Sequence, residues 1–492
     1  MSATGVPETA ELIPYFFLSR DLLARAGPPS YHPRMKASPK LLKLPPGPRS
    51  PIPGTVFRQL RRGPLEFLTK LTHDYGDISS FRAVGQLYVV INSPDLAQEI
   101  LQTRAAEFWK GPALQNSKGL LGEGLLTAEG DVHRRQRKLM QPAFHAKQVE
   151  TYSAQVLSST NDLITQWKKL SPNSSRQLDI RPEMMGLALV IAGRALFGAI
   201  LDSDIKTVHR CMDDLMNNYV RAVVPWGKLL NLLPLPSTRK LARARQDLIT
   251  LVDRMIAARR AEITAGNTSA TDLLSRMIAA TDQDGPPERS GCPVGGVDGA
   301  GGKGAPMSDT QLRDQALTIL TAGHETTANA MTFTLYLLAK YPVEQNKLRN
   351  SLSGRPDQEF QSQDSPLGHV LLESMRLYPP AWTVGRQNQT AMDIGGYHLP
   401  KKCTILIPQW TLHRDARFFP RSARLQSRPL AKTDPSAFRL HSFFHGSEEL
   451  HRRILCLAGN AHCPLPPCPQ LRFLPSARYA RPSINPRHHP SA

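Results

Sequence analysis

The chain of 492 residues has few cysteines, no long apolar run and a shortage of acidic residues. Its six cysteines follow no regular spacing, which argues against a disulfide framework and fits a reducing cytoplasm. The apolar run at residues 12–18 is followed by Arg20 and Asp21. It is therefore too short and too charged to span a bilayer, and permits at most peripheral membrane contact. We find no clear signal peptide and expect a cytoplasmic protein.

The shortage of acids leaves a formal net charge of +20, from 61 Lys and Arg against 41 Asp and Glu. Such a charge invites a nucleic-acid-binding interpretation. However, the basic residues are dispersed, and residues 421–492 alone contribute 11 Lys and Arg against 3 Asp and Glu. We therefore expect no nucleic-acid partner, although a basic binding protein stays open as an alternative of another class.

A long helix is predicted between Ser308 and Pro342. Ser308 and Gln311 form a capping-box pattern at its start, apolar residues follow at helical spacing, and Pro342 ends it. The helix would be about 45 Å long, enough to cross a whole domain. Near its middle the chain reads Ala-Gly-His-Glu-Thr-Thr at residues 322–327.

This hexapeptide places a glycine, an acid and two hydroxyls in an otherwise apolar helix. Gly323 costs about 1 kcal/mol against alanine, so a local opening beside a ligand would explain its presence. The alternative is a buried helix whose polar side chains are merely hydrogen-bonded. A zinc helix is excluded, because Ala328 occupies the position of the second histidine ligand.

A second polar pair lies in a short helix predicted over residues 366–378. Glu373 and Arg376 are three residues apart, so they share one face and are surrounded by apolar residues. A buried carboxylate–guanidinium pair would need further hydrogen bonds to be tolerated. The alternative is an ordinary exposed pair that contributes about a few tenths of a kcal/mol.

Six segments together resemble the cytochrome P450 family of haem-thiolate monooxygenases, over about residues 45–420. They occur in the family's order, as residues 44–54, 88–101, 130–144, 322–327, 373–376 and 412–420. The resemblance is to a bacterial-type soluble member. It implies a mainly α fold with a small β-rich lobe and an incomplete C-terminal part, preceded by a partly flexible segment at residues 1–44.

The resemblance also implies roles for individual residues. Glu325 and Thr326 would be catalytic and relay protons during the cleavage of dioxygen. His133, Arg137 and Arg386 would bind the haem propionates, because arginine grips carboxylates through two N–H donors. His133 stands where the family usually has tryptophan, and Arg137 alone could equally be a solvated member of its basic run.

Glu373 and Arg376 would form the family's structural pair. The implied cofactor is haem, an iron protoporphyrin, with electrons from an external redox partner. An acidic ferredoxin, flavodoxin or reductase would suit the basic chain. The implied reaction inserts one oxygen atom from dioxygen into a small apolar organic substrate.

The resemblance ends before the cysteine loop that holds the iron, whose pattern is F-x-x-G-x-R-x-C-x-G. Phe443 and Gly446 supply the first part, but Glu448 stands at the arginine position and Leu450 at the cysteine position. Cys456 is near but out of register. The metal ligand is therefore unassigned, and we expect weak haem binding or none.

Composition changes over the same stretch, since residues 421–492 hold 10 prolines and three of the six cysteines without a sustained apolar period. We interpret this stretch as a basic, Pro- and Cys-rich aberrant tail, translated out of frame or from a damaged gene. A divergent but genuine tail is the alternative. The chain is then either a monooxygenase or a catalytically inactive, haemless relic of the family.

Overall fold

The computed structural model describes ten stretches of the chain. They are residues 44–48, 54–83, 85–141, 152–170, 178–198, 202–218, 235–266, 272–280, 307–353 and 365–419. The predicted tail at 421–492, with Cys456, and all but the last residue of the predicted segment 1–44 lie outside these stretches.

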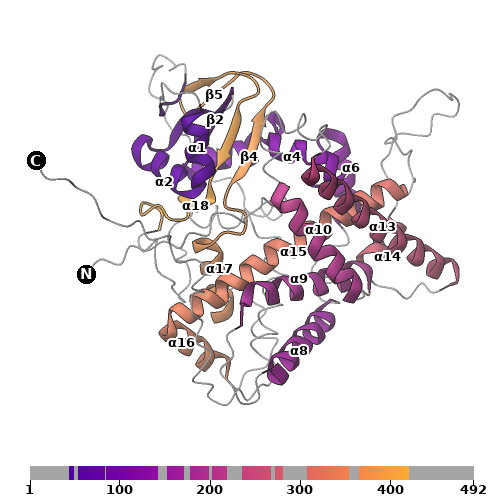
Figure 1. The fold of residues 1–492 in the computed structure, drawn as a ribbon. Coiled ribbons are helices and arrows are strands. Elements are labelled where there is room, and N and C mark those ends of the chain that lie inside the picture. Colours follow the sequence, from indigo (N-terminus) through magenta and orange to yellow (C-terminus); the bar gives the residue numbers. More distant parts are fainter. Residues whose placement is uncertain are drawn as a thin grey trace, which may run out of the picture.

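Helix α15, Asp309–Lys340, runs without a break through the centre of the helical body (Figure 1). The Ser308 side chain accepts a hydrogen bond from the Gln311 backbone, and the Gln311 side chain accepts one from the Ser308 backbone. The predicted long helix and its capping box are thus confirmed. The surrounding helices are α8 Ser153–Leu170, α9 Ile180–Phe197, α10 Asp202–Asn218, α13 Pro236–Thr264, α14 Leu273–Ala279, α16 Pro342–Leu352 and α17 Pro366–Leu377.

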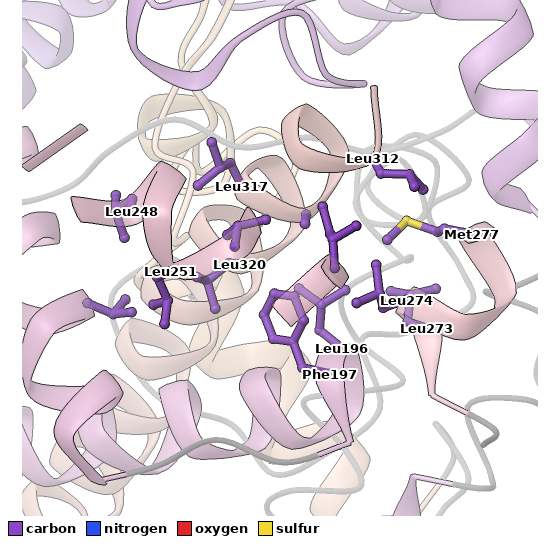
Figure 2. Packing of buried hydrophobic residues seen from close by; sticks show 14 of the residues in the cluster. Leu196, Phe197, Leu248, Leu251, Leu273, Leu274, Met277, Leu312, Leu317 and Leu320 are labelled. Carbon is purple, nitrogen blue, oxygen red and sulfur yellow. The ribbon is translucent and has the colours of Figure 1, made fainter. Parts of the chain in front are cut away.

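The core of this body is formed by apolar side chains from six helices, which are α6 Gly130–Met140, α9, α10, α13, α14 and α15. Figure 2 shows leucines, Phe197 and Met277 from α9, α13, α14 and α15 meeting around the first half of α15. Each large apolar side chain buried in this way stabilises the fold by about 1.5–3 kcal/mol. The core therefore fixes α15 against its neighbours and sets the position of the hexapeptide that follows.

A small β-rich lobe lies at one end of the helical body (Figure 1). Its main sheet has the strand order β1-β2-β7-β4-β3, parallel between β2 and β7 and antiparallel elsewhere. The strands are β1 Ile78–Ala83, β2 Gln86–Ile91, β3 Phe108–Lys110, β4 Val384–Asn388 and β7 Thr404–Ile407, with β5 Met392–Ile394 and β6 Tyr397–Leu399 as a separate hairpin. This confirms the predicted mainly α fold with a small β-rich lobe.

Short helices complete the lobe and its connection to the body. They are α1 Thr55–Arg62, α2 Pro64–Tyr75, α3 Pro94–Gln98, α4 Pro112–Asn116, α5 Lys118–Leu121, α6 Gly130–Met140 and α18 Gln409–Leu412. Within the described stretches, no helix is both long enough and apolar enough to cross a bilayer.

The loop before α6 docks on the first turns of α15. The backbone N–H of Glu123 donates to Asp314 Oδ2 at 2.7 Å, and that of Leu125 donates to Gln315 Oε1 at 3.0 Å. A Cβ atom at Gly124 would lie 2.1 Å from Thr318 Oγ1, so only glycine allows this approach. The contact fixes α6, and with it His133 and Arg137, relative to the central helix.

Candidate active site

The central hexapeptide has one partly exposed face. Ile319, Ala322, Gly323 and Thr326 recur at helical spacing and are all partly accessible, whereas the residues between them are mostly buried. A Cβ atom at Gly323 would meet only Ala192 Cβ within 4 Å, at 3.9 Å. The Thr326 hydroxyl donates to the carbonyl oxygen of Ala322 at 2.7 Å. The result is an apolar, partly accessible stripe that carries one hydroxyl.

Glu325 points away from this stripe into the protein. Its side chain is only 3% exposed, and Oε1 has no hydrogen-bond partner among the described residues. Burial raises the pKa of Glu325 to about 8, against a smaller opposing effect of Arg181 and a reinforcing one of Asp213. The carboxyl group is therefore mostly protonated at neutral pH. No hydrogen bond joins it to the Thr326 hydroxyl within the described chain.

This raised pKa makes stability depend on pH. Between about pH 4.5 and about pH 8 the folded state binds more protons at Glu325 than the unfolded state does, so stability falls as pH rises through this window. We expect Glu325→Gln to reduce that dependence. Urea denaturation at the two ends of the window measures it, with the exposed Glu66→Gln as control. If stability in Glu325→Gln depended on pH as strongly as in the unmutated chain, this would contradict the raised pKa of Glu325.

A second group of polar side chains gathers where the sheet meets α6. Lys110 on β3 and Arg386 on β4 are directly opposite each other in the antiparallel ladder, so they share one face. Burial, helped by the positive charges of Lys110, Arg137 and Arg386, lowers the pKa of His133 on α6 to about 4. The three predicted propionate-binding residues thus lie near one another, together with Lys110, which the sequence did not indicate.

These neighbouring cations can attract an anion in addition to the nearby Glu129. Like charges directly opposite in a ladder destabilise a sheet. Desolvation lowers the pKa of Lys110 to about 8 and that of Arg386 to about 10, with Glu129 as the acid that opposes this. Arg386 keeps some accessible surface and donates to the Gly385 carbonyl at 3.0 Å, but forms no ion pair among the described residues. The group fits a ligand that carries two carboxylates.

Glu373 and Arg376 form a buried bidentate pair in α17. Both N–H···O distances are 2.7 Å, and the side chains are 2–3% exposed. Arg376 Nη1 also donates to the His413 carbonyl at 2.7 Å, and the guanidinium lies 5.1 Å from the centre of the Phe419 ring. The exposed alternative for this pair is therefore wrong, and the pair connects α17 to the segment after α18.

Comparison with known proteins agrees with this combination of fold and charged groups. The sequence pattern described as Cytochrome P450 matches residues 45–426. The chain belongs to the cytochrome P450 family. It is thus an oxidoreductase, and the family's cofactor is haem iron, supplied with electrons by an external redox partner. The alternative of a basic binding protein with a fortuitous resemblance is excluded by this assignment.

Individual P450 relatives are moderately similar. Cyclooctatin synthase from Streptomyces melanosporofaciens is 31% identical over 378 residues, which cover 75% of this chain and 76% of the relative. Pentalenene oxygenase from Streptomyces avermitilis is 27% identical over 382 residues, covering 76% and 78%. The solved structure "Retinoic acid bound cyanobacterial CYP120A1" superposes with a TM-score of 0.68 at 22% identity, covering 85% of this chain and 91% of that one. That likeness supports the P450 fold.

The axial ligand of a P450 iron is not found in the described part of this chain. Its two cysteines, Cys211 and Cys403, are buried, and burial raises the pKa of each thiol to about 11, which disfavours a thiolate. The described residues also hold no cluster of three or more His, Cys, Asp or Glu that could bind a metal. The described residues therefore offer candidates for holding the haem propionates and none for ligating the iron.

Proposed function

We propose that this P450 inserts one oxygen atom from dioxygen into a small apolar organic substrate. The observation that carries the proposal is the stripe of Ile319, Ala322 and Gly323, which is apolar, partly accessible and directly beside the Thr326 hydroxyl. Two relatives support the proposed oxygen insertion, since they are named cyclooctat-9-en-7-ol 5-monooxygenase and pentalenene oxygenase. The substrate would lie along this stripe, where apolar contact provides most of its binding free energy.

Haem, when bound, supplies the iron at which dioxygen is activated by electrons from the redox partner. Arg386, Lys110 and Arg137 would hold its propionates by their positive charge beside the sheet, and the neutral His133 ring would donate a hydrogen bond. Charge-assisted hydrogen bonds to carboxylates are about twice as strong as neutral ones. Exposed basic residues of α6, including Arg134 and Lys138, would face an acidic electron-donor protein.

Glu325 and Thr326 would deliver protons from the α15 side. Glu325 is a protonated acid at neutral pH, so it can donate a proton and regain one. The Thr326 hydroxyl donates to the Ala322 carbonyl, and its oxygen can still accept a proton and pass its own on. Because Glu325 is buried and lies off the accessible stripe, ordered water would have to join its carboxyl group to the Thr326 hydroxyl.

This role predicts uncoupling in Thr326→Ala. In a haem-loaded chain whose residues after 420 come from a relative with the cysteine loop, product formed per electron should fall at least about tenfold, with hydrogen peroxide released instead. Glu325→Gln should slow turnover. The matched control is Thr332→Ala, because Thr332 is also partly exposed on α15 and also bonds back one turn, to Ala328 at 2.7 Å.

The experiment follows electron use, substrate oxygenation and peroxide in parallel. Equal coupling in Thr326→Ala and Thr332→Ala would reject the proton-delivery role. Absence of any oxygenated product from apolar substrates in the unmutated chain would reject the proposed function itself.

A second candidate is a catalytically inactive member of the family. It is favoured by Glu448 and Leu450, which replace the arginine and cysteine of the family's loop, and by the family match that ends at residue 426. The two candidates share the fold and differ in whether the iron gains a thiolate ligand.

A further inference from the structure

A fully buried histidine precedes the acid of the hexapeptide. His324 is 0% exposed, and neither of its ring nitrogens makes a hydrogen bond of regular geometry with the described residues. The Met185 carbonyl lies close enough to favour the charged ring, but burial dominates and lowers the pKa of His324 to about 3. Buried polar groups are normally hydrogen-bonded, so this ring needs an explanation.

A second histidine lies against the first. The His209 ring on α10 packs edge to face with the His324 ring on α15, with 5.3 Å between the ring centres and 79° between the planes. His209 is half-buried, and Asp213, one turn further along α10, is exposed. Asp213 and His209 on α10 thus lead from solvent to the buried His324 ring on α15, and Glu325 is the next residue along α15. Rotation of either imidazole at this separation can bring a nitrogen of one ring toward a nitrogen of the other.

The charges around these side chains favour passing a proton along rather than holding it on a histidine ring. Arg181 on α9 disfavours the charged form of His324, and so does His209 on α10. Asp213 favours the charged form of His209 and raises the pKa of Glu325. A proton is thus attracted at the outer end, is unstable on the middle ring, and is held at the inner carboxyl group. A metal site is excluded, since no described cluster has the ligands for one.

We propose that His209 and His324 conduct protons between solvent at α10 and the carboxyl group of Glu325. The proposal rests on the proton-delivery role proposed above for Glu325. His209 takes a proton from water on one nitrogen and gives the proton of its other nitrogen to His324. His324 in turn gives the proton of its far nitrogen to the Glu325 carboxylate. Only N–H and O–H bonds form and break, no electron moves, and rotation of each neutral ring restores the starting state.

The test measures proton exchange at Glu325 directly, in the full-length chain without haem, electrons or substrate. The infrared C=O band of the protonated carboxyl group is assigned by its loss in Glu325→Gln. Its shift after transfer to deuterium oxide gives the exchange rate. We expect this rate to fall at least about tenfold in His324→Phe and in His209→Phe, because a positioned proton-transfer group contributes about 10²–10⁴-fold.

The matched control is His398→Phe, since His398 on β6 is exposed and pairs with Asp393 outside this region. His324→Gln keeps polarity and similar size without carrying protons, so it replaces His324→Phe if that variant fails to fold. An exchange rate unchanged in the His324 and His209 variants would overturn the proposal. So would the absence of a Glu325 carboxyl band near neutral pH. Because the readout needs no haem, failure here leaves the monooxygenase proposal standing, and failure of oxygenation leaves this result intact.

Discussion

The reduced, carbon-monoxide-treated chain is expected to show no thiolate-type Soret band. Phe443 and Gly446 begin the family's pattern, but Leu450 stands at the cysteine position, and the two described cysteines are buried thiols of raised pKa. Without a thiolate the iron lacks the ligand that favours O–O cleavage. The difference spectrum of the purified full-length chain measures this.

Two variants make the result decisive. Cys456→Ser should leave the spectrum unchanged, because Cys456 is out of register with the pattern by six residues. Replacing residues 421–492 by the corresponding segment of cyclooctatin synthase should restore the band, because under the proposed function the described part would provide the propionate side. A thiolate band in the unmutated chain that disappears in Cys456→Ser would show that the tail is genuine and functional.

Glu373→Ala is expected to lower the free energy of unfolding by about 3–5 kcal/mol. The substitution leaves the Arg376 guanidinium buried, with the His413 carbonyl as its remaining hydrogen-bond acceptor among the contacts described above. For comparison, Asp131→Ala removes an i,i+3 pair with Arg134 in which both side chains are exposed, so it should change stability little. Thermal and urea denaturation measure the change in the free energy of unfolding for each of the two variants.

A double variant separates burial of charge from loss of contact. Glu373→Leu combined with Arg376→Met should cost less than Glu373→Ala alone, because it leaves no unpaired charge in the interior. A double variant that loses as much stability as the sum of the two single variants would contradict this, because additivity means that the two side chains contribute independently.

The sequence predicted those parts of the fold that depend on neighbouring residues. The start of α15 followed from Ser308 and Gln311, which form its capping box, and its end from Pro342. The spacing of Glu373 and Arg376 placed them on one face, although burial had to be read from the structure. Such features depend on contacts within one turn, which periodicity and capping residues encode directly.

Contacts between distant segments could not be predicted in the same way. The register that places Lys110 opposite Arg386 joins residues 276 positions apart, and no local pattern fixes it. His209 carries no motif, and its contact with His324 depends on how α10 packs against α15. The roles of the site residues remain predictions until the variants above are measured, and the interpretation of residues 421–492 as an aberrant tail concerns residues outside the described stretches.

The cross-strand pair of Lys110 and Arg386 has a consequence for the protein in a cell. Lys110 is buried and Arg386 partly buried, so their mutual repulsion opposes folding, and a dianionic group bound by them under the proposed function would stabilise the folded state by mass action. Cofactor supply would then set the lifetime of the protein, because chains that fold before loading unfold more often and are degraded by proteases. The amount of this protein in the cell, and not only its catalytic rate, would then depend on haem biosynthesis.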